Sequence, residues 1–312
     1  MTMPAPLVSI VIPCYNQGRY LGDGLDSACR QTYEAVEVIV VDDGSTDDTA
    51  RVAASRPGVR YVHQQNAGTA AARNRGVADS RGELLLFLDA DDRLLPDAVA
   101  RGVDYLARHP DAAFVTGHVR LIHADGTPDV VPTQEHEAAG YPALLRWNYI
   151  WTPGVVLYRR SAVLDAGGFD PAAAGSADFD LNIRIARRRA VACHHHVILE
   201  YRQHDANMTR DPAHMLRSAV SVRRREKRHA RAADLHAAWR TGLRAVQADF
   251  GARLIDRIKG DLVRGRRWRA VQGLLCLLRH HPAGLAAMAA PAEWPKLVAR
   301  RWRAASPPAS GR

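Results

Sequence analysis

Cysteine is scarce in this chain of 312 residues. The four cysteines lie far apart and form no Cys-x-x-Cys motif; they are Cys14, Cys29, Cys193 and Cys276. This spacing excludes a disulfide framework and the usual structural zinc sites. We therefore expect free thiols, as in a reducing cytoplasm.

Long hydrophobic runs are also missing. The first apolar stretch, residues 7–12, has neither a basic lead nor a small-residue cleavage site, so we expect no secretory leader and a mature chain that begins near Met1. A later apolar stretch, Trp268–Ala292, is interrupted by arginine, histidine and proline. A spanning helix needs about 18 or more apolar residues in a row, so none is expected.

Neither part of the chain has balanced charge. Residues 213–312 contain 22 basic and 6 acidic side chains, a formal charge of +16, whereas residues 1–212 carry −6. This change in composition predicts two domains, a catalytic body over residues 1–212 and a basic α-helical region over residues 213–312. The end of the chain, around Ser306–Pro308, is expected to be disordered.

Short β-branched runs alternate with helical stretches from residue 7 to about residue 118, and a further strand and helix are predicted after them. The predicted strands are Val8–Ile12, Val36–Val41, Val59–His63, Leu84–Leu88 and Gly154–Tyr158, and the predicted helices are Tyr20–Gln31, Asp47–Ser55, Thr69–Asp79, Pro96–His109 and Phe179–Arg189. This order is typical of an α/β fold with a Rossmann-like, mostly parallel sheet flanked by helices. The nearly continuous apolar strands indicate that both faces of the sheet are buried.

Acidic side chains follow two of these strands. Asp42 and Asp43 end the second strand, and Asp89 and Asp91 follow the fourth. Ligands bind at the carboxyl ends of parallel strands, and carboxylates crowded there repel one another unless a cation or a donor partners them. The Asp89-x-Asp91 spacing suits Mg²⁺ or Mn²⁺ together with substrate phosphates. Each cluster taken alone is equally explained by ordinary loop and helix-capping residues.

Seven short motifs follow one another along the chain. They are Ser9–Asn16, Val41–Asp47, Asn66–Gly68 with Ala72–Gly76, Leu88–Asp92, Gly167–Asp170, Asp178–Leu181, and Tyr201–His204 with Asn207–Thr209. In this order they resemble the family 2 glycosyltransferases over roughly two thirds of the chain. The resemblance implies a GT-A-like fold with a C-terminal helical extension, and an inverting enzyme that uses a nucleotide-diphosphate sugar.

The resemblance also implies which residues bind the nucleotide. Pro13, Tyr15 and Asp43 would line the pocket for the base, where Asp43 would accept a hydrogen bond from a uracil-like imide. The Tyr15 ring suits stacking on a base, although it suits ordinary packing as well. Arg73 would face the nucleotide, and Asp89 would contact the ribose or a metal ion.

Metal binding and catalysis are likewise assigned by the resemblance. Asp89, Asp91 and His204 would hold Mn²⁺ or Mg²⁺ at the diphosphate, although a single histidine is often structural. Asp178 corresponds to the catalytic base, which inversion requires on the face opposite the leaving nucleotide.

Two features bear on these site assignments. The family often has Glu-Asp where this chain has Ala177-Asp178, so Asp178 alone can serve as base there, with Asp180 as the fallback. The run His194–His196 would alternate between the two sides of a strand, so it cannot offer three ligands to one ion. We interpret it as surface and packing.

Two arginine-rich segments, Arg223–Arg228 and Arg264–Arg269, carry much of the positive charge. Nucleic acid is not expected as a partner, because no base-reading module is recognisable and the body is acidic. Residues 266–278 combine arginine with tryptophan and leucine, which suits an interfacial helix on an anionic membrane surface. The same apolar residues equally suit packing against the catalytic domain, and both interpretations stay open.

The predicted function is transfer of one sugar per encounter from a nucleotide-diphosphate donor, expected to be a UDP-sugar, to a hydroxyl of a glycan or lipid-linked acceptor. A Gln-x-x-Arg-Trp motif of processive synthases is not evident after Asp178. Assembly of a cell-envelope glycan or polysaccharide is the expected setting, in the cytoplasm or on the inner face of the membrane.

Two alternative functions remain. A sugar-nucleotide nucleotidyltransferase also places a nucleotide and Mg²⁺ on an α/β sheet, but the first 212 residues contain no lysine to hold a phosphate. A catalytically degenerate glycan-binding scaffold is favoured only by Ala177. Detection of products from a panel of sugar nucleotides separates these possibilities.

Overall fold

The computed structural model describes residues 5–130 and 139–285. Its strands are β1 (Val8–Cys14), β2 (Val36–Asp42), β3 (Val59–His63), β4 (Leu84–Phe87), β5 (Arg93–Leu94), β6 (Ala112–Ile122), β7 (Val156–Arg159) and β8 (Ala190–Arg202). Its helices are α1 (Gly18–Cys29), α2 (Thr49–Ala54), α3 (Thr69–Asp79), α4 (Ala98–Arg108), α5 (Tyr141–Arg146), α6 (Arg160–Asp165), α7 (Ala177–Ala186), α8 (Pro212–Glu226), α9 (Ala233–Val263) and α10 (Arg267–His280), with 3₁₀ turns η1 (Pro153–Val155), η2 (Pro171–Ser176) and η3 (Met208–Arg210). The expected disordered end around Ser306–Pro308 lies outside the described residues.

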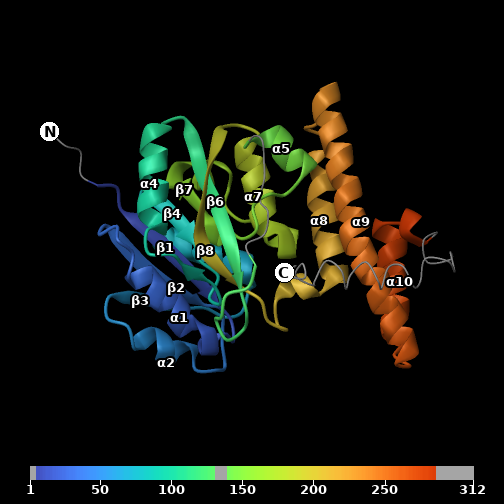
Figure 1. Ribbon diagram of the computed structural model, residues 1–312, viewed down its shortest axis with the longest axis horizontal. Helices are drawn as coiled ribbons and strands as arrows, with labels where there is room; N and C mark the ends of the chain where they lie inside the picture. The colour runs from blue at the N-terminus through green and yellow to red at the C-terminus, as the bar shows by residue number, and fades with distance from the viewer. Residues whose placement is uncertain (1–4, 131–138, 286–312) are drawn as a thin grey trace, which may run out of the picture.

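Eight strands form one sheet in the order β3-β2-β1-β4-β7-β6-β8-β5 (Figure 1). The first four are parallel, as predicted from the opening β-α units. Strand β7 is antiparallel to β4 and β6, whereas β6 and β8 are parallel to each other. The α/β class and the sheet flanked by helices are confirmed.

Burial explains why the strands are so apolar. Every residue of β1 and of β4 is buried, because helices cover both faces of the sheet there. Helix α3 lies close against β1, and a Cβ atom on Gly76 would approach Cγ1 of Val11 to 2.1 Å. A glycine is therefore required where this helix crosses the strand.

Helix α1 begins two residues earlier than predicted. The backbone N–H of Gly18 donates to Oδ2 of Asp47, at 2.8 Å, from the loop before α2. This carboxylate replaces a local capping side chain, since Gln17 makes no side-chain cap. A cap supplied from 29 residues along the chain is a tertiary contact, which sequence signals for helix starts do not reveal.

The C-terminal helices α8, α9 and α10 lie side by side at one end of the molecule (Figure 1). Part of this region belongs to the main core, including Val222 and Trp239. A second cluster joins the three helices, with Leu216, Leu254 and Leu277 at its centre. Helices α8 and α9 thus pack on the catalytic body, whereas one face of α10 packs on α8 and α9.

The opposite face of α10 is exposed. Trp268, Val271, Leu275 and Leu278 have exposed fractions of 71%, 42%, 59% and 56%. Their spacing of three, four and three residues places them in one stripe along the helix, which we call the α10 stripe. None of the described helices is long and apolar enough to cross a membrane.

Candidate active site

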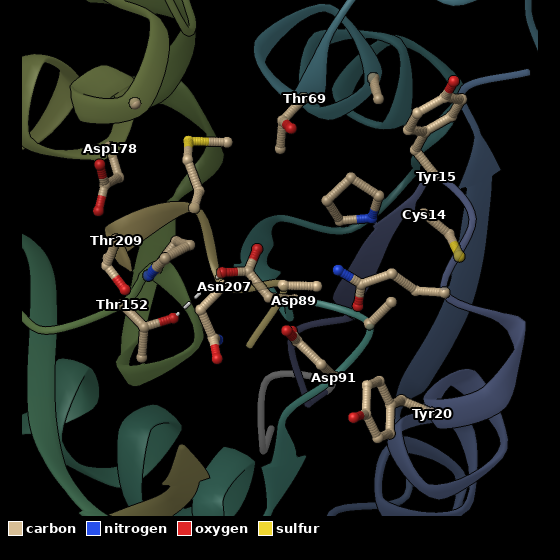
Figure 2. A pocket seen from close by; sticks show the side chains of 18 of the residues that line it. Cys14, Tyr15, Tyr20, Thr69, Asp89, Asp91, Thr152, Asp178, Asn207 and Thr209 are labelled. Carbon is tan, nitrogen blue, oxygen red and sulfur yellow. Dashed lines mark hydrogen bonds between the residues drawn. The ribbon is translucent and has the colours of Figure 1, made fainter. Parts of the chain in front are cut away.

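A cavity of about 430 Å³ opens at the carboxyl ends of β1, β2 and β4 (Figure 2). We call it the central pocket. Segments far apart in the sequence line it, because the sheet brings strand ends and the starts of α3 and α7 to one edge. All eight residues expected to form the site line this pocket; they are Pro13, Tyr15, Asp43, Arg73, Asp89, Asp91, Asp178 and His204.

Asp43 is fixed at one wall by three donors. Its Oδ1 accepts hydrogen bonds from the Gln64 side chain at 2.7 Å and from the Ala67 backbone at 2.8 Å, and its Oδ2 accepts from the Gly68 backbone at 2.8 Å. A carboxylate has about four acceptor positions, so one remains for a further donor. Tyr15 lies on the same side of the pocket with 51% of its surface exposed, which leaves its ring available for stacking.

Arg73 and Asp89 form an ion pair in the middle of the pocket. A guanidinium nitrogen of Arg73 donates to Oδ1 of Asp89 at 2.7 Å, and Arg73 is itself buried. The guanidinium also lies 5.3 Å from the ring centre of Phe169. A buried arginine with one carboxylate partner is a suitable binding group for a second anion.

Two of the motifs are joined by Asn74, the residue after Arg73. The side chain of Asn74 on α3 donates to the backbone oxygen of Phe169 and accepts from its backbone nitrogen, both at 2.8 Å. Gly168 has a φ of +71°, and a Cβ there would lie 2.6 Å from Oδ1 of Asn74. The glycine pair is thus required for the turn to approach α3.

Asp91 is held by His204, which lies at the end of the segment after β8. Nε2 of His204 is 2.8 Å from Oδ2 of Asp91, and the ring of Tyr20 stacks on the imidazole with centroids 4.7 Å apart. Burial, and then the charge of Asp89, raise the pKa of Asp91, whereas His204 lowers it. A cation beside Asp91 would relieve this unfavourable crowding of negative charge.

Asp178 and Asp180 occupy different environments on the first turn of α7. Asp178 lines the central pocket, and Figure 2 shows it on the wall away from Tyr15. Burial raises the pKa of Asp178, although the charge of Arg73 opposes that effect. Asp180 is buried outside the pocket lining and pairs with Arg184 at 2.8 Å and Arg225 at 3.0 Å. The fallback base is therefore occupied in ion pairs.

The family model described as Glycosyl transferase family 2 matches residues 9–164, which is half of the chain. The chain belongs to glycosyl transferase family 2. The sequence-based expectation of the family is thereby confirmed.

Known proteins resemble this chain in sequence and, at lower identity, in fold. An uncharacterised glycosyltransferase of Rickettsia typhi, RT0329, is 29% identical over 217 residues, which covers 66% of this chain and 66% of that protein. The chain therefore spans just under two thirds of that relative's length.

Two solved structures share the fold at lower identity. S. aureus TarS 1–349 in complex with UDP-GlcNAc has a TM-score of 0.63 at 16% identity, covering 90% of this chain and 83% of that one. The mannosyltransferase PcManGT of Pyrobaculum calidifontis, in complex with GDP-Man and Mn²⁺, has a TM-score of 0.59 at 21% identity, covering 93% and 88%. Both likenesses concern the fold alone.

Some pocket residues of the glycosyltransferase were not expected from sequence. The Thr152 hydroxyl lies 3.4 Å from carboxylate oxygens of both Asp89 and Asp92, and Trp151 beside it lines the pocket with 44% of its surface exposed. These two precede η1 and carry no motif. Tyr20 lies on a predicted helix, but its stacking partner His204 is 184 residues away in the sequence. No local pattern signals such a contact.

Proposed function

We propose that the central pocket binds a nucleotide-diphosphate sugar, expected to be a UDP-sugar, and that the enzyme transfers the sugar with inversion to an acceptor hydroxyl. The observation that carries this proposal is the convergence of the eight expected residues on one cavity. The UDP-GlcNAc and GDP-Man bound to the two structural neighbours support a donor of this class.

In this proposal the nucleotide lies along the wall formed by β1 and β2. Pro13 and Tyr15 contact the base, and the remaining acceptor position of Asp43 receives an N–H from its edge. Arg73 neutralises part of the diphosphate charge, and Asp89 orients Arg73 while it contacts the ribose or a metal ion. The Arg73–Asp89 ion pair at 2.7 Å keeps both groups in place before the donor binds.

A divalent cation, Mn²⁺ or Mg²⁺, fits the donors around Asp91. Carboxylate oxygens and one imidazole suit Mn²⁺, and PcManGT is known with this ion. Asp91, Asp89 and His204 would hold the cation, and the stacked Tyr20 ring orients the His204 ligand. When bound, the cation would stabilise the negative charge of the leaving diphosphate.

Asp178 is proposed as the catalytic base. It takes a proton from the acceptor hydroxyl as that oxygen attacks the anomeric carbon, and the nucleotide diphosphate leaves from the opposite face. Its raised pKa makes it a better proton acceptor than an ordinary aspartate. Asp180 cannot easily replace it, because Arg184 and Arg225 both bind its carboxylate.

The acceptor and the location are part of the same proposal. The absence of a Gln-x-x-Arg-Trp motif after Asp178 supports transfer of one sugar per encounter, to a glycan or lipid-linked acceptor of the cell envelope. The α10 stripe, with arginines at Arg267 and Arg269 beside Trp268, suits binding to an anionic membrane surface from the cytoplasmic side.

Nucleotide binding provides the first test. Thermal unfolding of the full chain is measured with UDP or GDP, each with and without Mn²⁺, because a ligand that binds the native state raises the melting temperature. For Asp91→Asn, the nucleotide concentration that gives the same Mn²⁺-dependent rise in melting temperature should be about tenfold higher or more. Asp205→Asn is the control, since Asp205 is 99% exposed outside the pocket. UDP binding by the unmodified chain that stays unchanged in EDTA, or Mn²⁺-dependent binding that stays unchanged in Asp91→Asn, contradicts the metal assignment.

Product analysis with a panel of sugar nucleotides tests the reaction itself. Release of nucleotide diphosphate together with a glycoside of inverted configuration supports the proposal. Formation of pyrophosphate and a sugar nucleotide from a sugar phosphate and a nucleoside triphosphate would instead identify a nucleotidyltransferase. Donor binding without turnover on any acceptor would identify a degenerate scaffold.

A further inference from the structure

A second group of ligand-type side chains lies between β6 and β8, away from the central pocket. It consists of His118, Cys193 and His195, which we call the β6–β8 cluster. The potential ligand atoms all lie within 4.8 Å of one another, and none of the three residues lines the pocket. His118 and Cys193 are buried, whereas His195 is exposed. We propose that this cluster binds a zinc-type transition-metal ion.

An irregularity in the sheet builds the cluster. Thr116 pairs with Cys193 and His118 pairs with Val197, so two steps along β6 correspond to four steps along β8. The extra residues form a bulge in which His195 has a φ of +55°, a conformation that is unfavourable for non-glycine residues. The surrounding sheet maintains this conformation.

The bulge also separates the histidine run into two sets. His194 lies on the other face of the sheet, where a Cβ on Gly117 would be 2.4 Å from its ring. Cys193 and His195 instead lie beside His118. The sequence predicted that the three consecutive histidines do not converge on one point, and they do not. His118, from the neighbouring strand β6, instead joins Cys193 and His195 in the β6–β8 cluster.

The distances match those of a shared metal ion. Zinc bonds of about 2.0–2.1 Å to nitrogen and 2.3 Å to sulfur, at tetrahedral angles, separate two nitrogens by about 3.4 Å and sulfur from nitrogen by about 3.6 Å. Nε2 of His118 and Nδ1 of His195 are 3.3 Å apart, and Sγ of Cys193 lies 3.7 Å and 3.8 Å from them.

The donor set determines the class of ion. Two imidazoles and one thiolate favour Zn²⁺, Co²⁺ or Cu over Mg²⁺ and Mn²⁺, which prefer oxygen ligands. Three protein ligands leave one position for water, and the exposed His195 gives the ion access from solvent. Binding displaces the thiol proton of Cys193 and joins β6 to β8, the strand that leads to Tyr201 and His204 in the central pocket.

Metal titration of the untagged, metal-free full chain tests the inference. Co²⁺ is the probe, because a cobalt–thiolate bond gives a charge-transfer absorption that oxygen and nitrogen ligands do not give. We expect one Co²⁺ per chain with this absorption, displacement by Zn²⁺ but not by excess Mg²⁺, and a higher melting temperature with Zn²⁺.

Matched variants separate the cluster from adventitious binding. Cys193→Ser should abolish the thiolate absorption, and His195→Gln should lower the affinity for Co²⁺ at least tenfold. His196→Gln changes an exposed histidine of the same run, and Cys29→Ser changes an exposed cysteine; both should bind as the unmodified chain does.

Three outcomes would overturn the inference. They are a thiolate absorption that persists in Cys193→Ser, its loss in Cys29→Ser, or no thiolate absorption in the unmodified chain. The last result would mean that hydrogen bonds to sulfur and packing alone account for the cluster. Because the His195 side chain is exposed, His195→Gln is expected to fold and keeps the test decisive if Cys193→Ser does not.

Discussion

The position of a single residue on α7 determines whether its carboxylate faces the central pocket. Asp178 and Asp180 are two positions apart, and each residue of an α-helix turns by about 100°, so their side chains point in nearly opposite directions. Asp178 meets the central pocket, and Asp180 meets Arg184 and Arg225. A carboxylate that faces the pocket and one held in two ion pairs therefore have separable roles in catalysis and in stability.

Asp178→Asn should lower kcat by a factor on the order of 10² to 10⁴ and leave donor affinity almost unchanged, because the amide keeps the shape but cannot accept the proton. Steady-state kinetics together with nucleotide thermal shifts measure the two effects. Asp180→Asn is the comparison: it should lower the melting temperature by breaking two ion pairs while the folded fraction stays active. The reverse result would place the base at Asp180.

The pH dependence of kcat/KM gives a second test of Asp178. The base acts only when deprotonated, and its pKa is raised, so activity should fall on the acid side at a higher pH than for an ordinary aspartate with a pKa near 3.9. The charge of Arg73 lowers the pKa of Asp178 against the effect of burial, so Arg73→Gln should move the acid limb to still higher pH. Arg73→Lys keeps the positive charge and should return the acid limb part of the way to its original pH. An acid limb that does not respond to Arg73→Gln would assign the titration to another group.

Whole elements carry these side chains, and α3 shows how closely they are packed. This helix holds Arg73 and Asn74 while Gly76 lies directly on Val11 of β1. The helix cannot shift away without moving the guanidinium in the pocket. The position of Arg73 is therefore coupled to one glycine a turn away.

Gly76→Ala should destabilise the protein by about 1–3 kcal/mol, because the new methyl group overlaps Val11. Donor affinity should fall as well, since α3 must move and Arg73 moves with it. Chemical denaturation and nucleotide thermal shifts measure the two changes. Gly22→Ala on α1 is the matched control: its nearest neighbours are 3.9 Å away, so the better helix propensity of alanine should stabilise it by up to about 1 kcal/mol. Equal losses in both variants would rule out the close contact as the cause.

The molecule as a whole combines a pocket at the carboxyl ends of the strands with a basic helical layer. Figure 1 shows this layer, α8 to α10, at one end of the molecule. Removing everything after about residue 211 would take Val222, Ala238 and Trp239 out of the main core. It would also leave Asp180 without Arg225. The proposed division at residue 212 therefore describes composition and function more than independent folding, and membrane binding is better tested by surface substitutions.

The full chain should sediment with anionic vesicles at low salt and dissociate as salt rises, because each basic residue near the surface contributes roughly 1 kcal/mol and salt screens it. Trp268→Ser with Leu275→Ser should weaken binding by removing apolar insertion. Trp147→Ser with Leu164→Ser removes a tryptophan and a leucine elsewhere, with exposed fractions of 56% and 55%, and should bind normally. Equal vesicle binding by both double variants, or none by the unmodified chain, would leave solvation and packing as the account of α10.

Local sequence was sufficient for much of the fold. Each of the first four strands was predicted to within two residues of its observed ends. Strands β1, β2 and β4 are largely buried and apolar between polar turns, whereas the edge strand β3 is largely exposed and was predicted from its β-branched residues. The positions of Asp43, Asp89 and Asp91 followed from the same signal, since ligand groups stand where such strands end. The boundaries of α1 and the two-residue β5 were not predicted, because contacts from distant segments define them.

The sequence by itself determined the residue types at the pocket, their order and the charge of the C-terminal region. Only the tertiary structure decided that Asp180 forms two ion pairs while Asp178 faces the pocket, that one face of α10 is buried and the other exposed, and that His118 meets Cys193 and His195. Each of these depends on a partner from a distant segment, or on a bulge that turns one side chain. A pattern with a period of two or 3.6 residues specifies a face of an element, but packing between elements specifies what that face meets.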